Sequence, residues 1–171
     1  MEWLGEVPAH WEVKRNKSIF RQADDRSTTG EEELLSVSHI TGVTPRSEKT
    51  VNMFMAETLE DYKRCQPGDL VINTMWAYMG ALGTAKILGV VSPSYNVYRT
   101  RNPECINPQY IDYLYRTPRH ITEIGRNSRG VWESRLRLYP NEFFDMRTPL
   151  PPRNGASRER TKGEPIACSV L

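Results

Sequence analysis

Apolar residues occur along this chain in short runs separated by turn-forming residues. The apolar runs at residues 69–72, 90–91 and 97–98 predict three strand cores. Residues 34–40, with the sequence LLSVSHI, alternate between apolar and polar side chains and predict a half-buried strand. Residues 13–21 predict a strand that becomes a helical turn. Several short strands are therefore expected in this part of the chain.

A helical pattern begins at Pro108, beyond which apolar side chains recur at spacings that fit one buried helical face. Proline is favoured at the first position of a helix, so Pro108 can start it. Pro118 is expected to kink or split the helix, because proline lacks the backbone N–H and clashes with the preceding turn. Gly125 is expected to end it.

The remaining segments give weaker local signals. Residues 42–46 are expected to form a turn, and residues 57–63 a short polar helix or turn. Later in the chain, residues 136–138 predict a short strand, residues 140–145 a helical turn and residues 146–150 a last strand.

Two loops carry side chains that a fold does not need on its surface. The connection over residues 73–81 is too polar and too interrupted by glycine for a core strand, yet it holds large side chains that folding alone would bury. We interpret it as a shaped loop that a rigid sheet presents to a binding partner. Asn73, Trp76 and Tyr78 are its candidate contact residues.

The second loop, residues 126–135, combines Arg126, Asn127, Arg129, Trp132 and Arg135. Arginine can hold guanine O6 and N7 with two hydrogen bonds, and asparagine can do the same for adenine. Such a composition also occurs in ordinary exposed loops, so it indicates nucleic-acid binding only slightly more than solvated surface.

Charge is unevenly distributed along the chain. The whole sequence has a net charge of +2, but residues 116–137 contain six arginines and two glutamates, a net charge of +4. The rest of the chain then sums to −2, so a polyanion would meet one basic face. Lys14 and Lys17 either carry ordinary solvated charge or contact phosphates.

Length and composition limit the class of protein. A chain of 171 residues is long enough for one domain with a core and too short for two of ordinary size. Hydrophobic residues make up 38% of the chain and charged residues 26%, which indicates a soluble globular protein. No apolar run approaches the roughly 18 to 20 residues of a membrane helix, and the N-terminus does not resemble a signal peptide. A cytoplasmic protein without membrane contact is expected.

No catalytic residue and no metal ligand is predicted. Cys65, Cys105 and Cys168 are an odd and widely spaced set that fits neither a CxxC metal site nor a disulfide framework, so they are interpreted as reduced thiols. His39 lies in the strand predicted over residues 34–40. A structural histidine is favoured there, because no serine or cysteine nucleophile motif accompanies it.

Three short strings resemble enzyme motifs but depart from them. Residues 92–95 (SPSY) and 107–110 (NPQY) approach the motif with which amino-methyltransferases hold a flipped base, yet both lack its second proline. No G-x-G cofactor turn occurs in the chain. Residues 80–86 (GALGTAK) lack the Gly-Lys-Ser/Thr of a P-loop. Turn-forming proline explains the first two strings better than catalysis does.

Four segments carry a family resemblance. WLGEVPAHWEVKR at 3–15, GDLVINTMWAYMGALG at 68–83 followed by VSPSYNVYR at 91–99, and LRLYPNEFFDMRTPLPP at 136–152 stand in the chain in this order. Together they resemble the target recognition domain of the specificity (S) subunit of type I restriction-modification systems, over about 150 of the 171 residues.

The resemblance implies a mixed α/β (α+β) fold, with a twisted, mostly antiparallel sheet, a few short helices and protruding recognition loops. It implies sequence-specific binding of double-stranded DNA through the major groove, where each such domain reads one half of a bipartite target. The S subunit is not an enzyme and needs no cofactor of its own. Modification (M) subunits bring S-adenosylmethionine and methylate adenine, and restriction (R) subunits use ATP and Mg to translocate and cut DNA.

The resemblance also suggests a division of the chain. Residues 1–152 are expected to form the DNA target recognition domain, and residues 153–171 a disordered or aberrant C-terminal tail. Family members continue into a long spacer helix and a second recognition domain, whereas this tail has glycine and proline and no heptad pattern. The chain therefore resembles the first half of an S subunit. The alternatives are a fragment of an adenine-specific DNA methyltransferase and a non-functional truncated remnant.

The sequence thus predicts that different segments contact the DNA backbone and the bases. The basic segment over residues 116–137, with Lys14 and Lys17, would bind backbone phosphates and make the affinity sensitive to salt. The loops over residues 73–79 and 126–135 would read the sequence, with aromatic side chains packed on thymine methyl groups or sugars.

Overall fold

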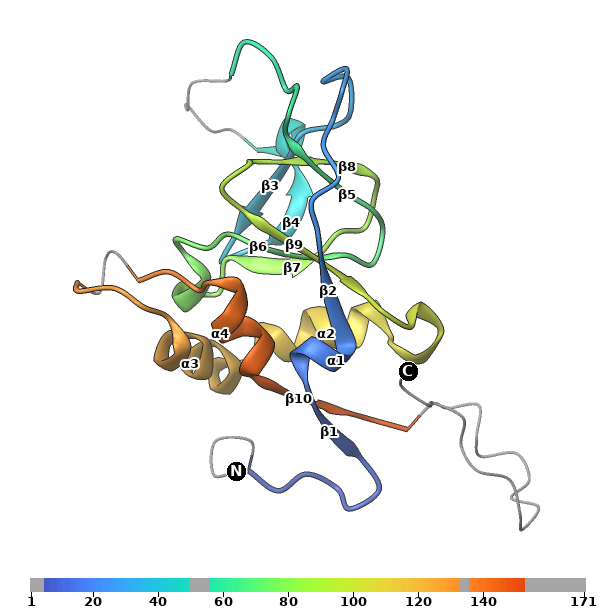
Figure 1. Ribbon diagram of the computed structural model, residues 1–171, viewed down its shortest axis with the longest axis vertical. Helices are drawn as coiled ribbons and strands as arrows, with labels where there is room; N and C mark the ends of the chain where they lie inside the picture. The colour runs from blue at the N-terminus through green and yellow to red at the C-terminus, as the bar shows by residue number, and fades with distance from the viewer. Residues whose placement is uncertain (1–4, 50–55, 133–135, 153–171) are drawn as a thin grey trace.

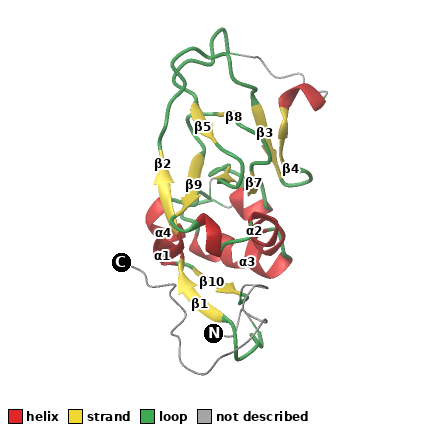
Figure 2. Ribbon diagram, turned by 90° about the vertical axis from the view of Figure 1, so that its right-hand side faces the viewer, coloured by secondary structure: helices red, strands yellow, loops and turns green. Residues whose placement is uncertain are grey.

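The structure of the protein is a computed structural model that describes residues 5–49, 56–132 and 136–152 (Figure 1). The molecule is elongated and has three layers along its long axis (Figures 1 and 2). Most of the strands lie at one end, the helices form the middle layer, and a two-stranded ribbon lies at the other end. Among the described residues, none of the helices has the length and apolar character needed to cross a membrane.

A four-stranded antiparallel sheet is the centre of the fold. Its strand order is β2 (Phe20–Ala23), β9 (Asn96–Thr100), β6 (Leu70–Ile72) and β7 (Leu82–Thr84). Successive side chains of a strand point to opposite faces of the sheet, and both faces of this sheet are covered. Leu70, Ile72 and Tyr98 face the helices, whereas Val71 and Val97 face the smaller sheets.

Three two-stranded antiparallel sheets complete the arrangement of the described strands. They are β3 (Leu35–Ser38) with β4 (Gly42–Pro45), β5 (Lys63–Cys65) with β8 (Gly89–Val91), and β1 (Glu12–Arg15) with β10 (Arg147–Leu150). The first two pairs enclose a second apolar core on the outer face of the central sheet. The β1–β10 pair lies beyond the helices and joins the two ends of the described chain (Figure 2).

Among the residues that the structure describes, four α-helices occur, and they form the middle layer (Figure 2). They are α1 (Asn16–Ile19), α2 (Pro108–Tyr115), α3 (Pro118–Asn127) and α4 (Pro140–Asp145). The described part of the chain also contains three short 3₁₀ turns, η2 (Arg46–Glu48), η3 (Ala77–Met79) and η4 (Pro103–Cys105). The last three α-helices each begin with proline, whose missing N–H would have no partner at a helix start in any case. The side chain of Thr117 accepts a hydrogen bond from the backbone N–H of His120, so a new helix starts after Thr117.

The fold class predicted from the sequence is confirmed: this is a mixed α+β protein with antiparallel sheets and few helices. The predicted strand cores lie in β6, β8 and β9, and the predicted half-buried strand is β3. The helix starting at Pro108 is split at Pro118 as expected, and residues 140–145 form α4. The predicted last strand is β10.

Three local predictions were wrong, and three strands were missed. The segment predicted as a turn over residues 42–46 contains strand β4, because Val43 pairs with Val37 and is buried. Strands β2, β5 and β7 were not predicted, since these short segments are stabilised by pairing with β9, β8 and β6. The strand predicted over residues 136–138 is a single β-bridge between Arg129 and Arg137. Helix α3 does not end at Gly125 but continues to Asn127.

His120 makes the stability of the fold dependent on pH. It is fully buried on α3, with its ring 4.5 Å from the ring of Tyr115, and burial lowers the pKa of His120 to about 4. An exposed histidine has a pKa of about 6.5, so the unfolded chain binds one more proton than the folded chain between these values. The free energy of unfolding should therefore fall by about 3 kcal/mol as the pH is lowered through this window.

Urea denaturation at a series of pH values measures this loss. In His120→Gln the fall in stability below neutral pH should be clearly shallower than in the wild type. The control His39→Gln, which replaces an exposed histidine, should keep the wild-type slope. Equal slopes in all three proteins would show that protonation of His120 is not what weakens the fold in acid.

Candidate nucleic-acid interface

The two loops predicted to read DNA are neighbours in the structure. The loop over residues 73–81 packs against α3, where Tyr78 lies beside Gly125 and Ile121 lies against Gly80. The carbonyl oxygen of Thr74 accepts a hydrogen bond from the N–H of Leu138, 3.3 Å away, in the segment that follows the second loop. Both loops project from the same side of the molecule (left in Figure 1).

Backbone hydrogen bonds close the first loop tightly. The N–H of Asn73 donates to the carbonyl oxygen of Ala81 at 3.0 Å, and the N–H of Ala81 donates to that of Trp76 at 3.1 Å. Gly80 ends η3 with a φ of 89°, a left-handed conformation that favours glycine. This closed loop holds the side chains of Trp76 and Met79 in solvent, with Trp76 48% exposed.

The buried side chain of Asn73 stabilises the conformation of this loop. Asn73 is only 7% exposed. Its Nδ2 donates a hydrogen bond to the hydroxyl of Tyr95 at 3.1 Å, and its Oδ1 accepts one from the N–H of Met75 at 3.3 Å. Both groups that could contact a base are therefore already engaged. Tyr78 is half-buried against α3, which leaves Trp76 as the outermost of the three predicted contact residues in this loop.

The second loop begins as helix. Arg126 and Asn127 are the last two residues of α3, and the side chain of Arg126 is 66% exposed with Nη1 3.7 Å from a carboxylate oxygen of Glu123. The amide nitrogen of Asn127 donates to the carbonyl oxygen and to the carboxylate of Glu123, at 2.9 Å and 3.0 Å. Because both amide hydrogens are used, Asn127 offers DNA only its Oδ1, which accepts from an amino group but cannot hold adenine with two hydrogen bonds.

Arg129 has the best-defined geometry of the predicted contact residues. Its backbone N–H and carbonyl both bond to the backbone of Arg137 at 2.9 Å, which fixes the base of the projecting loop. Its side chain is 74% exposed, and its Nε lies 2.5 Å from a carboxylate oxygen of Glu142 on α4. Trp132, further along, is 69% exposed. Arg135 lies outside the described residues.

The two predicted phosphate contacts lie elsewhere. Lys14 is on β1 and forms an ion pair with Glu12 at 2.7 Å, and Lys17 is exposed on α1. Both views place β1 and α1 apart from α3 (Figures 1 and 2). The structure therefore does not bring these lysines into the cluster formed by the two loops.

Several residues of this surface were missed in the sequence. Met79, Val131 and Tyr139 are large apolar residues that stay exposed beside the predicted contact residues. Glu123 and Glu142 form ion pairs with Arg126 and Arg129, respectively, and their side chains are only 17% and 15% exposed. The partners of Glu123, Arg126 and Asn127, lie three and four residues further along the chain on the same helix, so helical spacing in the sequence could have indicated them. Glu142 gave no local signal, because the packing of α3 and α4 brings Arg129 to it.

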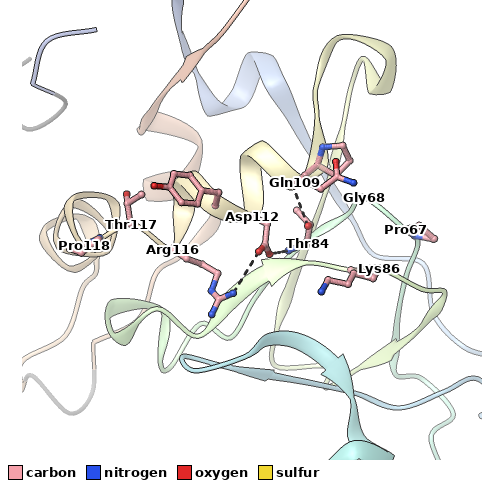
Figure 3. A pocket seen from close by; sticks show the side chains of 12 residues that line it. Pro67, Gly68, Thr84, Lys86, Gln109, Asp112, Arg116, Thr117 and Pro118 are labelled. Atoms are coloured by element: carbon pink, nitrogen blue, oxygen red, sulfur yellow. Dashed lines mark hydrogen bonds and ion pairs between the residues drawn. The ribbon is translucent and has the colours of Figure 1, made fainter. Parts of the chain in front are cut away.

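A groove of about 800 Å³ lies between α2, the start of α3 and the end of β7 (Figure 3). Its charged side chains join elements of the fold. Asp112 accepts a hydrogen bond from the N–H of Thr84 at 2.8 Å, and Arg116 donates to the carbonyl oxygen of Ile40 at 2.6 Å. The groove meets α3 at Pro118, the opposite end of that helix from Arg126. No group of three or more potential metal ligands occurs within the described part of the chain.

The fold of this chain is similar to that of two solved structures from type I restriction-modification systems. It superposes on the crystal structure of an HsdS subunit from Thermoanaerobacter tengcongensis with a TM-score of 0.52 and 16% identity, covering 86% of this chain and 35% of that one. A structure described in terms of complex assembly and conformational transition of the type I R-M system gives a TM-score of 0.53, also at 16% identity, over 86% of this chain and 36% of that one. No protein-family model matches the sequence, and the comparison with curated proteins gives no match.

The family resemblance seen in the sequence is thereby confirmed at the level of the fold. This chain spans about a third of the length of the two chains that it matches.

Proposed function

We propose that this protein binds double-stranded DNA sequence-specifically, as the recognition module of a type I restriction-modification complex. The observation that carries the proposal is the convergence of two separate loops on one side of the molecule. One loop carries the exposed Trp76, and the other carries the exposed Arg126, Arg129 and Trp132. Exposed arginines combined with aromatic side chains suit DNA, because they provide both phosphate contacts and base contacts. The shared fold supports the same function.

The geometry suggests a role for each side chain. Arg129 projects from a loop with a fixed base and would enter the major groove to contact a guanine. Among the described residues, the one ion pair of Arg126 is a long contact to Glu123, and Arg126 would bind a backbone phosphate. Trp76 and Trp132 would pack on thymine methyl groups or sugars. Each such domain would read one half of a bipartite target.

We propose further that this chain carries out no catalysis itself. The modification and restriction subunits would supply the methyltransferase and nuclease activities, together with S-adenosylmethionine, ATP and Mg. If the chain were instead part of an adenine methyltransferase, it would transfer a labelled methyl group from S-adenosylmethionine to DNA in the absence of partners. The proposed function predicts no such transfer.

Selection of bound duplexes from a pool with randomised sequence tests the proposal with the full 171-residue chain. The wild type should enrich one short motif, and Arg129→Ala should lose preference at one position of it, at a cost of about 1 to 3 kcal/mol. Arg147→Ala removes the same charge from β10, away from the loops, and should leave the motif unchanged. If the wild type enriches no motif, the proposed function is wrong.

A further inference from the structure

Arg129 is exposed but anchored on one side. Its Nε lies 2.5 Å from the Glu142 carboxylate, whereas its two terminal nitrogens make no hydrogen bond or ion pair with the residues that the structure describes. An arginine held through Nε presents Nη1 and Nη2 together at the free end of the side chain. Two parallel N–H groups are the arrangement that matches guanine O6 and N7, or two oxygens of one phosphate.

The anchor itself is rigid. Glu142 lies in the first turn of α4, and the next residue, Phe143, is fully buried among the aromatic side chains of the core. The carbonyl oxygen of Phe143 also accepts a hydrogen bond from the Nδ2 of the buried Asn16 at 2.9 Å. With the Arg129 backbone bonded to Arg137, the side chain is therefore held at its base and along its stem.

The other glutamate of this surface gives a contrast. Glu123 divides its carboxylate between Asn127, at 3.0 Å, and Arg126, at 3.7 Å. The contact of Glu123 with Arg126 is long and uses the terminal Nη1 of that arginine. The two terminal nitrogens of Arg126 are therefore not both left for a bidentate contact. Of the two arginines, only Arg129 is oriented through Nε by a nearby carboxylate.

A carboxylate paired with a DNA-binding arginine has a second effect. Its negative charge partly cancels the positive charge of the arginine, so it weakens the electrostatic attraction to the phosphates of DNA of every sequence. The bidentate contact with a base depends on orientation and gains from a fixed guanidinium. One carboxylate can therefore lower non-specific affinity and strengthen discrimination between bases.

We propose that Glu142 is a positioning residue for target recognition: it orients Arg129 to read a single base pair and suppresses binding to other DNA. This inference rests on the proposed function, because it assigns the origin of specificity within the same surface. Glu142 itself makes no contact with DNA.

Charge and orientation can be separated with two substitutions at this position. Glu142→Gln keeps an oxygen that can accept from Nε but removes the charge, so it should raise affinity for non-specific duplexes and retain the preferred base. Glu142→Ala removes both effects, so it should also raise non-specific affinity but reduce preference at the Arg129 position by about fivefold or more. Asp145→Asn is the matched control, since it removes one charge from the same helix at a residue paired with Arg15. It should change neither quantity.

The decisive measurement is a double-mutant cycle with the motif selected by the wild type. In the Arg129→Ala background, Glu142→Ala should have no further effect on base preference. If Glu142→Ala reduces preference equally with and without Arg129, it acts through general damage to the fold and the positioning role is rejected. If the wild type selects no motif, the proposed function fails first, before Glu142 is tested.

Discussion

Phe143→Ala is expected to destabilise the protein by about 3 to 5 kcal/mol, the usual cost of removing a fully buried phenylalanine side chain. The Phe143 ring stacks on Tyr98 with centroids 4.0 Å apart and an angle of 23° between the planes. It also meets Phe20 at 5.7 Å and Tyr115 at 6.1 Å. The substitution removes ring contacts to three elements and leaves a cavity where the helices meet the central sheet.

The adjacent Phe144 provides the control for this prediction. Phe144 is partly buried at the edge of the same cluster, with its ring 5.5 Å from Tyr98. Phe144→Ala should cost clearly less than Phe143→Ala, because more of its surface already contacts water. Urea denaturation should show lower midpoints for both variants with an unchanged slope of free energy against denaturant. Equal losses would mean that Phe143 does not hold the central place that the structure gives it.

Asp69→Ala is expected to have the second largest effect, a loss of about 3 kcal/mol. The Asp69 side chain is almost fully buried and accepts hydrogen bonds from Nε and Nη2 of Arg99, at 2.9 Å and 2.8 Å. It also accepts from the backbone N–H of Gln66 at 2.9 Å. These contacts raise the pKa of Arg99 far above its usual range. Removing the carboxylate leaves a mostly buried guanidinium with one remaining acidic partner.

That remaining partner, Asp25, is the natural comparison. Its carboxylate lies 2.9 Å from Nη1 of Arg99, but its side chain is 52% exposed. Asp25→Ala should therefore cost under about 1 kcal/mol, as exposed ion pairs usually do. Thermal or urea unfolding of the two variants gives the comparison. A larger loss in Asp25→Ala than in Asp69→Ala would contradict the assignment of Asp69 as the main partner of Arg99.

Local patterns in the sequence were sufficient for much of the fold. The apolar runs that became β6, β8 and β9 are buried, so hydrophobic patterning alone identified them. Pro108, Pro118 and Pro140 each begin a helix, because proline constrains its own backbone whatever surrounds it. Strands β2, β4, β5 and β7 were missed because their strand conformation depends on pairing with a neighbouring strand more than on their own sequence patterns.

The sequence by itself determined that this chain forms short strands and proline-initiated helices, and that two of its loops are rich in aromatic and basic side chains. Only the tertiary structure decided that these loops meet, that Asn73 is turned inward, and that Glu142 lies behind Arg129. The physical reason is the distance along the chain over which each effect acts. Backbone preference and hydrophobic period act over a few residues, whereas Glu142 and Arg129 are brought together by the packing of α3 and α4 on one core.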